Sequence, residues 1–334
     1  MGPMTILVTG AGGYLGQATV RAALARGHRV RALVRRAVDL PGAVPANMPA
    51  TMPPAMPAAM PPGVEVFSAD LAQGGPIPGR AALDVGAVIH CAARLSGPEA
   101  AIIRDTVTAT EGLFHAILTT GQQPRMVLVS SLSVYGAGGL PPGALLDETC
   151  PLETRGHLRD AYTRAKMAQE GAALRLAAAG RLPLWLIRPG IIWGPGHLAN
   201  PHLGIGLGPL LLRAGAGQLP IAHVDHVAAA LVAAAETRPD GAEALNILDD
   251  DLPTRARWLA AAGGAGIVIP LHWRVPDALA GLLAPLAPRL PGLLRRPTLR
   301  ARLMPLTYTN GRARARLVWQ PRTPFADAMR AALP

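Results

Sequence analysis

The chain opens with a glycine-rich turn between a strand and a helix. Residues 4–9 form a short apolar run that favours a strand, and a helical pattern runs from residue 14 to residue 26. The turn between them reads Thr9-Gly10-Ala11-Gly12-Gly13-Tyr14-Leu15-Gly16. Its glycines permit a tight turn, close approach of the backbone to a pyrophosphate and close packing of helix on strand, while the helix N-terminus offers unpaired N–H groups. Placed between strand and helix, this pattern predicts dinucleotide binding; a plain glycine-rich turn is the alternative.

Strand and helix patterns alternate after this turn. Strands are expected at residues 29–34, 64–68, 87–91, 126–130, 184–187 and 244–248, and helices at 104–120, 160–179 and 224–236. The alternation predicts an α/β fold with a doubly wound parallel sheet, a Rossmann fold. We assign residues 1–188 with 223–248 to this domain. Residues 189–222 with 249–334, expected to be Gly/Pro-rich loops and short helices, form a smaller, mostly C-terminal substrate lobe.

A low-complexity insert of Met-Pro repeats occupies residues 37–62. Seven prolines between Pro45 and Pro62 exclude a helix or a central strand there, so an extended loop is expected. We favour a dispensable insertion over a functional flap.

The composition narrows the class of protein. Two cysteines, Cys91 and Cys150, are too few for a disulfide framework and match no metal-site spacing. No signal peptide and no apolar run of about 20 residues is visible, so a cytoplasmic protein is expected. The net charge of +11 comes from arginines scattered along the whole chain, without a nucleic-acid-binding motif. We therefore expect neither a metal nor a nucleic-acid partner.

The end of the second predicted strand bears on cofactor choice. It reads Leu33-Val34-Arg35-Arg36, without the acidic residue that usually accepts a hydrogen bond from the ribose 2′-hydroxyl of NAD. An arginine accommodates a 2′-phosphate instead, so Arg35 favours NADP, with NAD still possible. The alternative is that Arg35 is one more exposed arginine of an arginine-rich chain.

Tyr162 and Lys166 lie four residues apart in the predicted helix 160–179 and therefore on one face. A nearby ammonium lowers the pKa of a tyrosine toward the working range of a general acid or base. Tyr-x-x-x-Lys alone is a common string, but Lys166 is the single lysine among 32 basic residues. A lysine placed at random would fall here about once in 32 times, which favours a functional pair.

Taken together, the motifs resemble the extended short-chain dehydrogenase/reductases, within the NAD-dependent epimerase/dehydratase superfamily, over nearly the whole chain. The matching stretches are Thr9–Gly16, Asp70-Leu71, His90–Ala93, Val129–Gly136, Tyr162–Lys166, Arg188–Pro195, His223–Ala228 and Trp319–Pro324. The resemblance implies cofactor contacts at Gly10, Gly13, Tyr14, Leu15, Gly16, Arg35, Asp70, Leu71, Ala92, Ala93, Lys166, Pro189 and Ile192.

The resemblance also implies a mechanism. Hydride passes between the nicotinamide and a carbinol carbon, Tyr162 transfers the hydroxyl proton, Ser131 orients the oxygen, and Lys166 tunes Tyr162 and holds the ribose. Ser130 and Ser133 are near enough for a one-step misassignment. Two positions depart from the family pattern. Thr106 replaces an Asn that can relay protons, and His226 replaces the second Asp of an Asp-Asp pair; we interpret His226 as structural.

The substrate is expected to be small and hydrophobic. Ile191 stands where nucleotide-sugar enzymes usually carry an Asn, and the segment 203–212 is almost entirely Gly, Leu, Ile and Pro. An apolar pocket follows more naturally than a pyrophosphate site. We favour an NADP(H)-dependent oxidoreductase of a hydrophobic ketone or secondary alcohol, in the 3β-hydroxysteroid dehydrogenase/reductase-like branch.

Two alternatives remain open, a nucleotide-sugar epimerase or dehydratase with bound NAD and a non-catalytic NADP sensor of the same fold. A homodimer is also left open. Eight arginines between Arg289 and Arg316, with no acid from Ala278 to Ala326, suggest contact with an anionic membrane surface. We favour a solvated arginine face around a hydrophobic lid instead.

Overall fold

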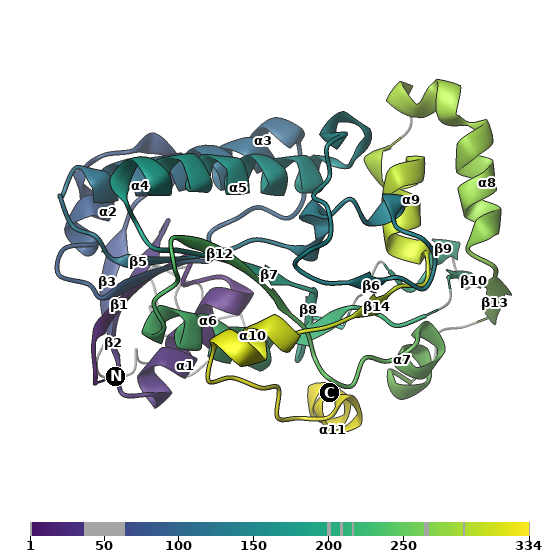
Figure 1. Cartoon of the computed structure of the whole chain (residues 1–334). Helices are drawn as coiled ribbons and strands as arrows, with labels where there is room; N and C mark the ends of the chain where they lie inside the picture. The colour runs from purple at the N-terminus through teal and green to yellow at the C-terminus, as the bar shows by residue number, and fades with distance from the viewer. Residues whose placement is uncertain are drawn as a thin grey trace, which may run out of the picture. The chain divides into compact units, whose positions relative to one another are not determined.

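The computed structural model describes residues 2–36, 64–198, 202–207, 210–215, 217–263, 267–289 and 291–333 (Figure 1). The insert 37–62 lies outside the described residues. The chain forms two compact units, each made of three segments. Unit 1 comprises Met1–Val129, Ala168–Ile187 and Ala228–Ala244, and unit 2 comprises Ser130–Met167, Arg188–Val227 and Leu245–Pro334. Residues 130–167, predicted from the sequence to belong to the cofactor domain, thus group with the C-terminal segments.

A seven-stranded sheet forms the centre of unit 1, with the order β12-β7-β5-β4-β1-β2-β3. From β7 to β3 neighbouring strands pair in parallel. The strands are β1 (Thr5–Thr9), β2 (Arg29–Val34), β3 (Val64–Ser68), β4 (Ala87–His90), β5 (Arg125–Val129), β7 (Leu184–Pro189) and β12 (Ala242–Ile247). The order reverses direction between β1 and β4, so the predicted doubly wound Rossmann sheet is confirmed.

Helices cover both faces of this sheet (Figure 1). They are α1 (Tyr14–Ala25), α2 (Pro76–Ala81), α3 (Glu99–Ile103), α4 (Ala109–Leu118), α5 (Ala161–Gly180) and α6 (Val224–Glu236). Leu113, Phe114 and Ile117 of α4 pack with Leu7 and Leu128 of the sheet, all fully or almost fully buried. The central strands β1, β4, β5 and β7 are buried along almost their whole length, which explains why they read as continuous apolar runs in the sequence.

The helix expected at 104–120 is longer and less regular than predicted. It begins at Glu99, directly after Pro98, and Arg104–Thr108 form a π-helical turn between α3 and α4. Proline at a helix start is compatible with its missing N–H group. A π-turn adds a residue to the helix and is common at functional sites. This turn carries Asp105 and Thr106 to the candidate site.

The described residues of unit 2 form three small sheets, β13-β10-β9, β11-β8 and β14-β6. Its strands are β6 (Leu145–Leu146), β8 (Ile191–Trp193), β9 (Ile205–Leu207), β10 (Leu210–Ala214), β11 (Ile221–His223), β13 (Ile267–Leu271) and β14 (Thr307–Tyr308). Its helices are α7 (Arg255–Ala261), α8 (Arg274–Leu282), α9 (Arg296–Leu303), α10 (Gly311–Arg316) and α11 (Phe325–Ala332). The prediction of loops and short helices after residue 189 was therefore incomplete, because it omitted these strands. The short helices between the prolines of the tail agree with it.

Candidate active site

The glycine-rich turn folds as a backbone cradle at the end of β1. Gly10 has φ +65°, in the region that favours glycine, and a Cβ there would lie 2.7 Å from the backbone N of Ala92. A Cβ on Gly16, in the first turn of α1, would lie 2.1 Å from the carbonyl oxygen of Gly10. Both positions therefore exclude a side chain. The turn and the α1 N-terminus fit a pyrophosphate, which binds to backbone N–H groups at such a helix end.

A cavity of about 620 Å³ opens over this cradle, within unit 1. It lies beyond the carboxyl ends of β1, β2 and β4, where the sheet order reverses and where doubly wound folds bind their ligands. Seven of the predicted cofactor contacts line it: Gly10, Gly13, Arg35, Asp70, Leu71, Ala92 and Ala93. Tyr14, Leu15 and Gly16 follow in the first turn of α1, whereas Lys166, Pro189 and Ile192 belong to unit 2.

Three arginines surround Asp105 at the rim of this cavity. Asp105 Oδ2 accepts from Arg94 Nε at 2.7 Å and from Arg35 Nη2 at 3.3 Å, and its Oδ1 accepts from Arg104 Nη1 at 2.7 Å. Arg104 also pairs with Asp70. Burial raises the pKa of Asp105, but the Arg94 hydrogen bond and the three positive charges outweigh it and the pKa is lowered. Three guanidinium groups face two carboxylates, and Arg36 also lines the cavity, so positive charge is in excess beside it.

Thr106, which replaces the family's Asn, forms hydrogen bonds beside this cavity through its hydroxyl and its carbonyl group. Its hydroxyl accepts from the N–H of Arg94 at 3.0 Å. Its carbonyl accepts from the Thr110 hydroxyl at 2.6 Å, and that hydroxyl also bonds His90 Nε2 at 2.9 Å. In this arrangement Thr106 orients the Arg94 segment.

Ser131, Tyr162 and Lys166 come together within unit 2. Ser131 begins the turn after β5, and Tyr162 lies in the first turn of α5, where Asp160 accepts from the backbone N–H of Thr163 at 3.0 Å. The Ser131 and Tyr162 side chains are hydrogen-bonded. Lys166 is almost fully buried, and its Nζ lies 6.0 Å from the centre of the Tyr162 ring.

The geometry also separates Ser131 from its neighbours. The hydroxyl groups of Ser130 and Ser133 are buried and have no hydrogen-bond partner among the described residues. Of the three serines, Ser131 is the one hydrogen-bonded to Tyr162.

The pKa of Tyr162 is raised above its ordinary value. Burial is the main cause, the negative charge of Asp160 adds to it, and the Ser131 hydrogen bond opposes it. The direction is opposite to the one expected from Lys166 alone, because burial disfavours the phenolate more than the Ser131 hydrogen bond stabilises it. Tyr162 is therefore a protonated phenol at neutral pH, as a proton donor to a carbonyl oxygen must be.

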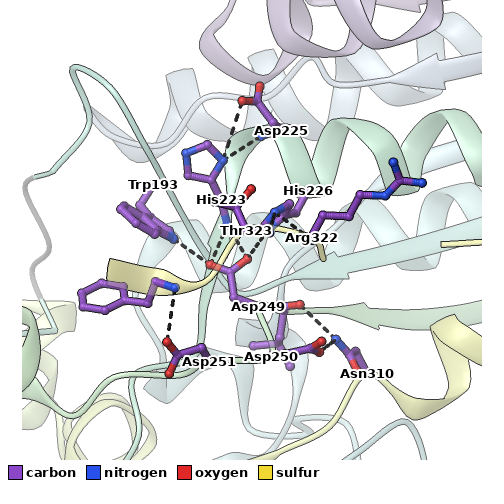
Figure 2. Close-up of polar contacts among 12 residues, drawn as sticks. Trp193, His223, Asp225, His226, Asp249, Asp250, Asp251, Asn310, Arg322 and Thr323 are labelled. Atoms are coloured by element: carbon purple, nitrogen blue, oxygen red, sulfur yellow. Dashed lines mark hydrogen bonds and ion pairs between the residues drawn. The ribbon is translucent and has the colours of Figure 1, made fainter. Parts of the chain in front are cut away.

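His226 belongs to a buried structural cluster around Asp249 (Figure 2). Its Nδ1 lies 2.7 Å from Asp249 Oδ1, and its Nε2 accepts from the backbone N–H groups of Arg322 and Thr323 at 3.3 and 3.2 Å. Because a backbone N–H can only donate, Nδ1 must carry the ring proton and donate it to Asp249. His226 therefore attaches the C-terminal Trp-Gln-Pro-Arg-Thr-Pro segment to α6, in agreement with a structural role.

Sequence reasoning missed Asp105, Arg94 and Arg104. The stretches that match the family motifs do not include these three residues. An additional arginine is also uninformative in a chain so rich in arginine. The available signal was that Asp105 is the single acidic residue between Glu99 and Glu111. Among the described residues, no group of His, Cys, Asp and Glu side chains is arranged to hold a metal ion. In the same residues, no helix has the length and apolar character needed to cross a membrane.

Comparisons with known proteins show the family and the fold of the chain. The family described as "NAD dependent epimerase/dehydratase family" matches residues 6–247. A 3-diazoavenalumate denitrifying reductase from a Streptomyces species is 30% identical over 96% of this chain and 97% of its own length. A 3β-hydroxysteroid dehydrogenase/Δ5→4-isomerase of Mycobacterium tuberculosis is 31% identical over 57% of this chain and 48% of its own length. The solved structure of MoeE5 in complex with UDP-glucose and NAD shares the fold, with a TM-score of 0.67 at 21% identity, covering 98% of this chain and 97% of that one.

Proposed function

Because the chain belongs to the NAD-dependent epimerase/dehydratase family and is an NAD(P)-dependent oxidoreductase of the extended short-chain dehydrogenase/reductase type, we propose that it uses NADP(H) to interconvert a hydrophobic ketone and a secondary alcohol. The observation that carries the proposal is that Ser131, Tyr162 and Lys166 come together in unit 2. Unit 1 of the same chain contains the glycine-rich cradle that fits a dinucleotide.

The proposed cofactor preference rests on the rim of the cavity. No acidic residue follows β2 to accept from a ribose 2′-hydroxyl, and Arg35 stands there instead. Asp105 holds Arg35 at 3.3 Å and also binds Arg94 and Arg104, so the arginines are gathered at one edge. The excess positive charge favours a 2′-phosphate, which carries negative charge that NAD lacks.

The proposed roles follow from proton chemistry. When bound, the nicotinamide donates or accepts the hydride. In reduction, Tyr162 donates its proton to the substrate oxygen, and Ser131 donates a hydrogen bond to the same oxygen; in oxidation Tyr162 takes the proton back. Lys166 supplies a positive charge beside the phenol and hydrogen bonds to the ribose. Tyr14, Leu15, Gly16, Pro189 and Ile192 complete the proposed cofactor contacts.

The proposed substrate class rests on the residues of unit 2. Ile191 and Ile192 of β8 are half-buried, and Leu211 and Leu212 of β10 are half-buried as well. These side chains offer apolar surface in the lobe that we assign to the substrate. The mycobacterial relative is named as a steroid dehydrogenase, which supports a largely apolar carbonyl or alcohol substrate.

The decisive experiment measures cofactor binding and turnover separately. NADPH and NADH affinities are measured by fluorescence titration for the native chain, for Arg35→Asp and for Arg21→Asp, a matched control at an exposed position of α1 that does not line the cavity. We expect Arg35→Asp to lose its preference for NADPH. An unchanged preference refutes NADP selection by Arg35. A panel of hydrophobic ketones, steroids included, is then tested with NADPH; no turnover of any of them refutes the proposed substrate class.

A further inference from the structure

Helix α8 of unit 2 has apolar residues on two sides. On one side Trp273, directly before the helix, and Pro276 and Ala280 within it are buried. Trp273 and Ala280 belong to a hydrophobic cluster with Leu299 and Leu303 of α9, which lies beside α8 (Figure 1). This side alone anchors α8 to the unit, so the fold does not require the other side of the helix to be covered.

The second apolar side of α8 is exposed. Val275, Leu279 and Leu282 are spaced i, i+4 and i+7, so they lie along one side of the helix. Leu283 and Leu286 follow directly after the helix end. All five side chains are exposed, Leu279 to 55% and Leu282 to 79%, and we call them the apolar face of α8. Single exposed leucines are common on proteins, but a contiguous exposed group of this kind marks a binding surface.

The chain around this face carries an excess of positive charge. Residues 272–303 contain six arginines and a single acid, Asp277. Arg296 donates to both oxygens of Asp277, at 2.9 and 3.1 Å, and Arg300 lies 3.9 Å away. The Arg296 hydrogen bond lowers the pKa of Asp277, burial opposes it, and the charges of both arginines lower it further. The one carboxylate is thus already paired, whereas Arg274 is exposed in the first turn of α8.

Charge and shape together select the partner of the apolar face. A second copy of the chain would bring the same arginines into a symmetric interface, where like charges repel. A protein groove that receives a helix encloses much of its circumference, but α9 already covers one side of α8. A flat anionic surface needs only the exposed side and supplies the opposite charge.

A membrane interface has these properties. Helices that lie in the plane of a membrane immerse Leu side chains at the level of the lipid headgroups and place Arg or Lys beside them. Anionic headgroups attract each such arginine within a few ångströms of the surface. The nine residues of α8 are far fewer than the about 20 needed to cross a bilayer, so such a helix lies on the membrane.

We propose that the apolar face of α8 inserts among the headgroups of an anionic lipid membrane, with the neighbouring arginines binding lipid phosphates. The exposure of its leucines favours this alternative over a solvated arginine face around a hydrophobic lid. The inference goes beyond the proposed function and does not depend on it, because it requires neither cofactor nor turnover.

Co-sedimentation of the full-length protein with extruded vesicles tests the proposal. Vesicles of phosphatidylcholine alone are compared with an equal mixture of phosphatidylcholine and phosphatidylglycerol. We expect the native chain to bind the mixed vesicles about ten-fold or more tightly than the neutral ones, and less tightly as salt is added.

Two pairs of variants locate the contact. Leu279→Gln with Leu282→Gln should weaken binding to the mixed vesicles about ten-fold or more, whereas Leu95→Gln with Val318→Gln should leave it unchanged. The control positions are 71% and 94% exposed and lie outside α8. Arg274→Glu should also weaken binding, and Arg330→Glu, which changes an exposed arginine of α11, should not.

Three results would overturn the membrane site. The first is no binding of the native chain to the mixed vesicles at low salt, and the second is equal binding by the native chain and the Leu279/Leu282 variant. The third is a native dimer in analytical ultracentrifugation that this variant converts to a monomer, which would assign the face to a second copy. Circular dichroism during heating shows that each variant is folded, so a loss of binding is not a loss of structure.

Discussion

Asp249→Asn should destabilise unit 2 by about 3 kcal/mol, because one carboxylate serves three buried donors (Figure 2). Asp249 is 5% exposed and accepts from Trp193 Nε1 at 2.9 Å, the backbone N–H of His223 at 2.9 Å and His226 Nδ1 at 2.7 Å. A hydrogen bond to a charged group contributes about 1.5–3 kcal/mol and a neutral one about 1 kcal/mol, so three weakened bonds cost roughly 2 kcal/mol. The amide NH2 of asparagine also faces a donor, which adds about 1 kcal/mol.

Urea unfolding followed by tryptophan fluorescence is the assay. Four of the five tryptophans, at positions 193, 258, 273 and 319, lie in unit 2, so the signal reports mainly on that unit. With a slope of about 2–3 kcal/mol per molar urea, the midpoint should fall by roughly 1 M.

Asp250→Asn is the matched control for this variant. Its side chain is 44% exposed and pairs with the exposed Arg314 and with the amide of Asn310, so its loss should cost less than about 1 kcal/mol. If the two variants lose the same stability, the argument that Asp249 unites the buried cluster is refuted.

Three further predictions concern the active site. Tyr162→Phe should lower kcat by about 10²–10⁴-fold, because the phenol proton is lost. NADPH affinity should be retained, because unit 1 is unchanged. Equal turnover by the variant and the native chain in steady-state assays would show that Tyr162 does not transfer the proton. Ser131→Ala should raise the pKa of Tyr162 further, because the Ser131 hydrogen bond lowers that pKa. The rise of kcat/KM for alcohol oxidation with pH should therefore shift to higher pH. Ser133→Ala is the control, and equal pH profiles for the two variants would contradict the assignment of Ser131. Gly16→Ala should abolish NADPH binding, because the added Cβ would lie 2.1 Å from the Gly10 carbonyl oxygen. Gly171→Ala in α5 is the control: its Cβ meets nothing nearer than 3.6 Å, so this variant should bind NADPH normally. Intact NADPH binding by Gly16→Ala in a fluorescence titration would show that the turn can relax.

The local patterns were predictable because each depends on residues close together in sequence. The glycine turn needs only Gly10–Gly16 between a strand and a helix, and Tyr162 and Lys166 need only one helix. The parallel sheet followed from continuous apolar runs separated by helical patterns. These features required no knowledge of how distant segments meet.

The missed features all depend on distant segments. Arg35 and Asp105 are 70 residues apart in the sequence, and no local sequence pattern predicts that they form an ion pair. β10 pairs with β13 in the register Leu210↔Ile267, and short apolar runs of this kind do not distinguish a strand from a loop or a helix. The raised pKa of Tyr162 is likewise a consequence of burial, which the Tyr-x-x-x-Lys pattern does not contain.

The division of each unit into three segments limits how the protein can be dissected. Because Ala168–Ile187 and Ala228–Ala244 return to unit 1 while the flanking stretches belong to unit 2, no single proteolytic cut and no terminal deletion releases an intact unit. A stop codon after residue 129 would leave five of the seven strands of the sheet and neither of the two contributed by later segments. The nascent chain therefore cannot complete its cofactor-binding sheet until β12 has left the ribosome, about 90 residues before the end of the sequence.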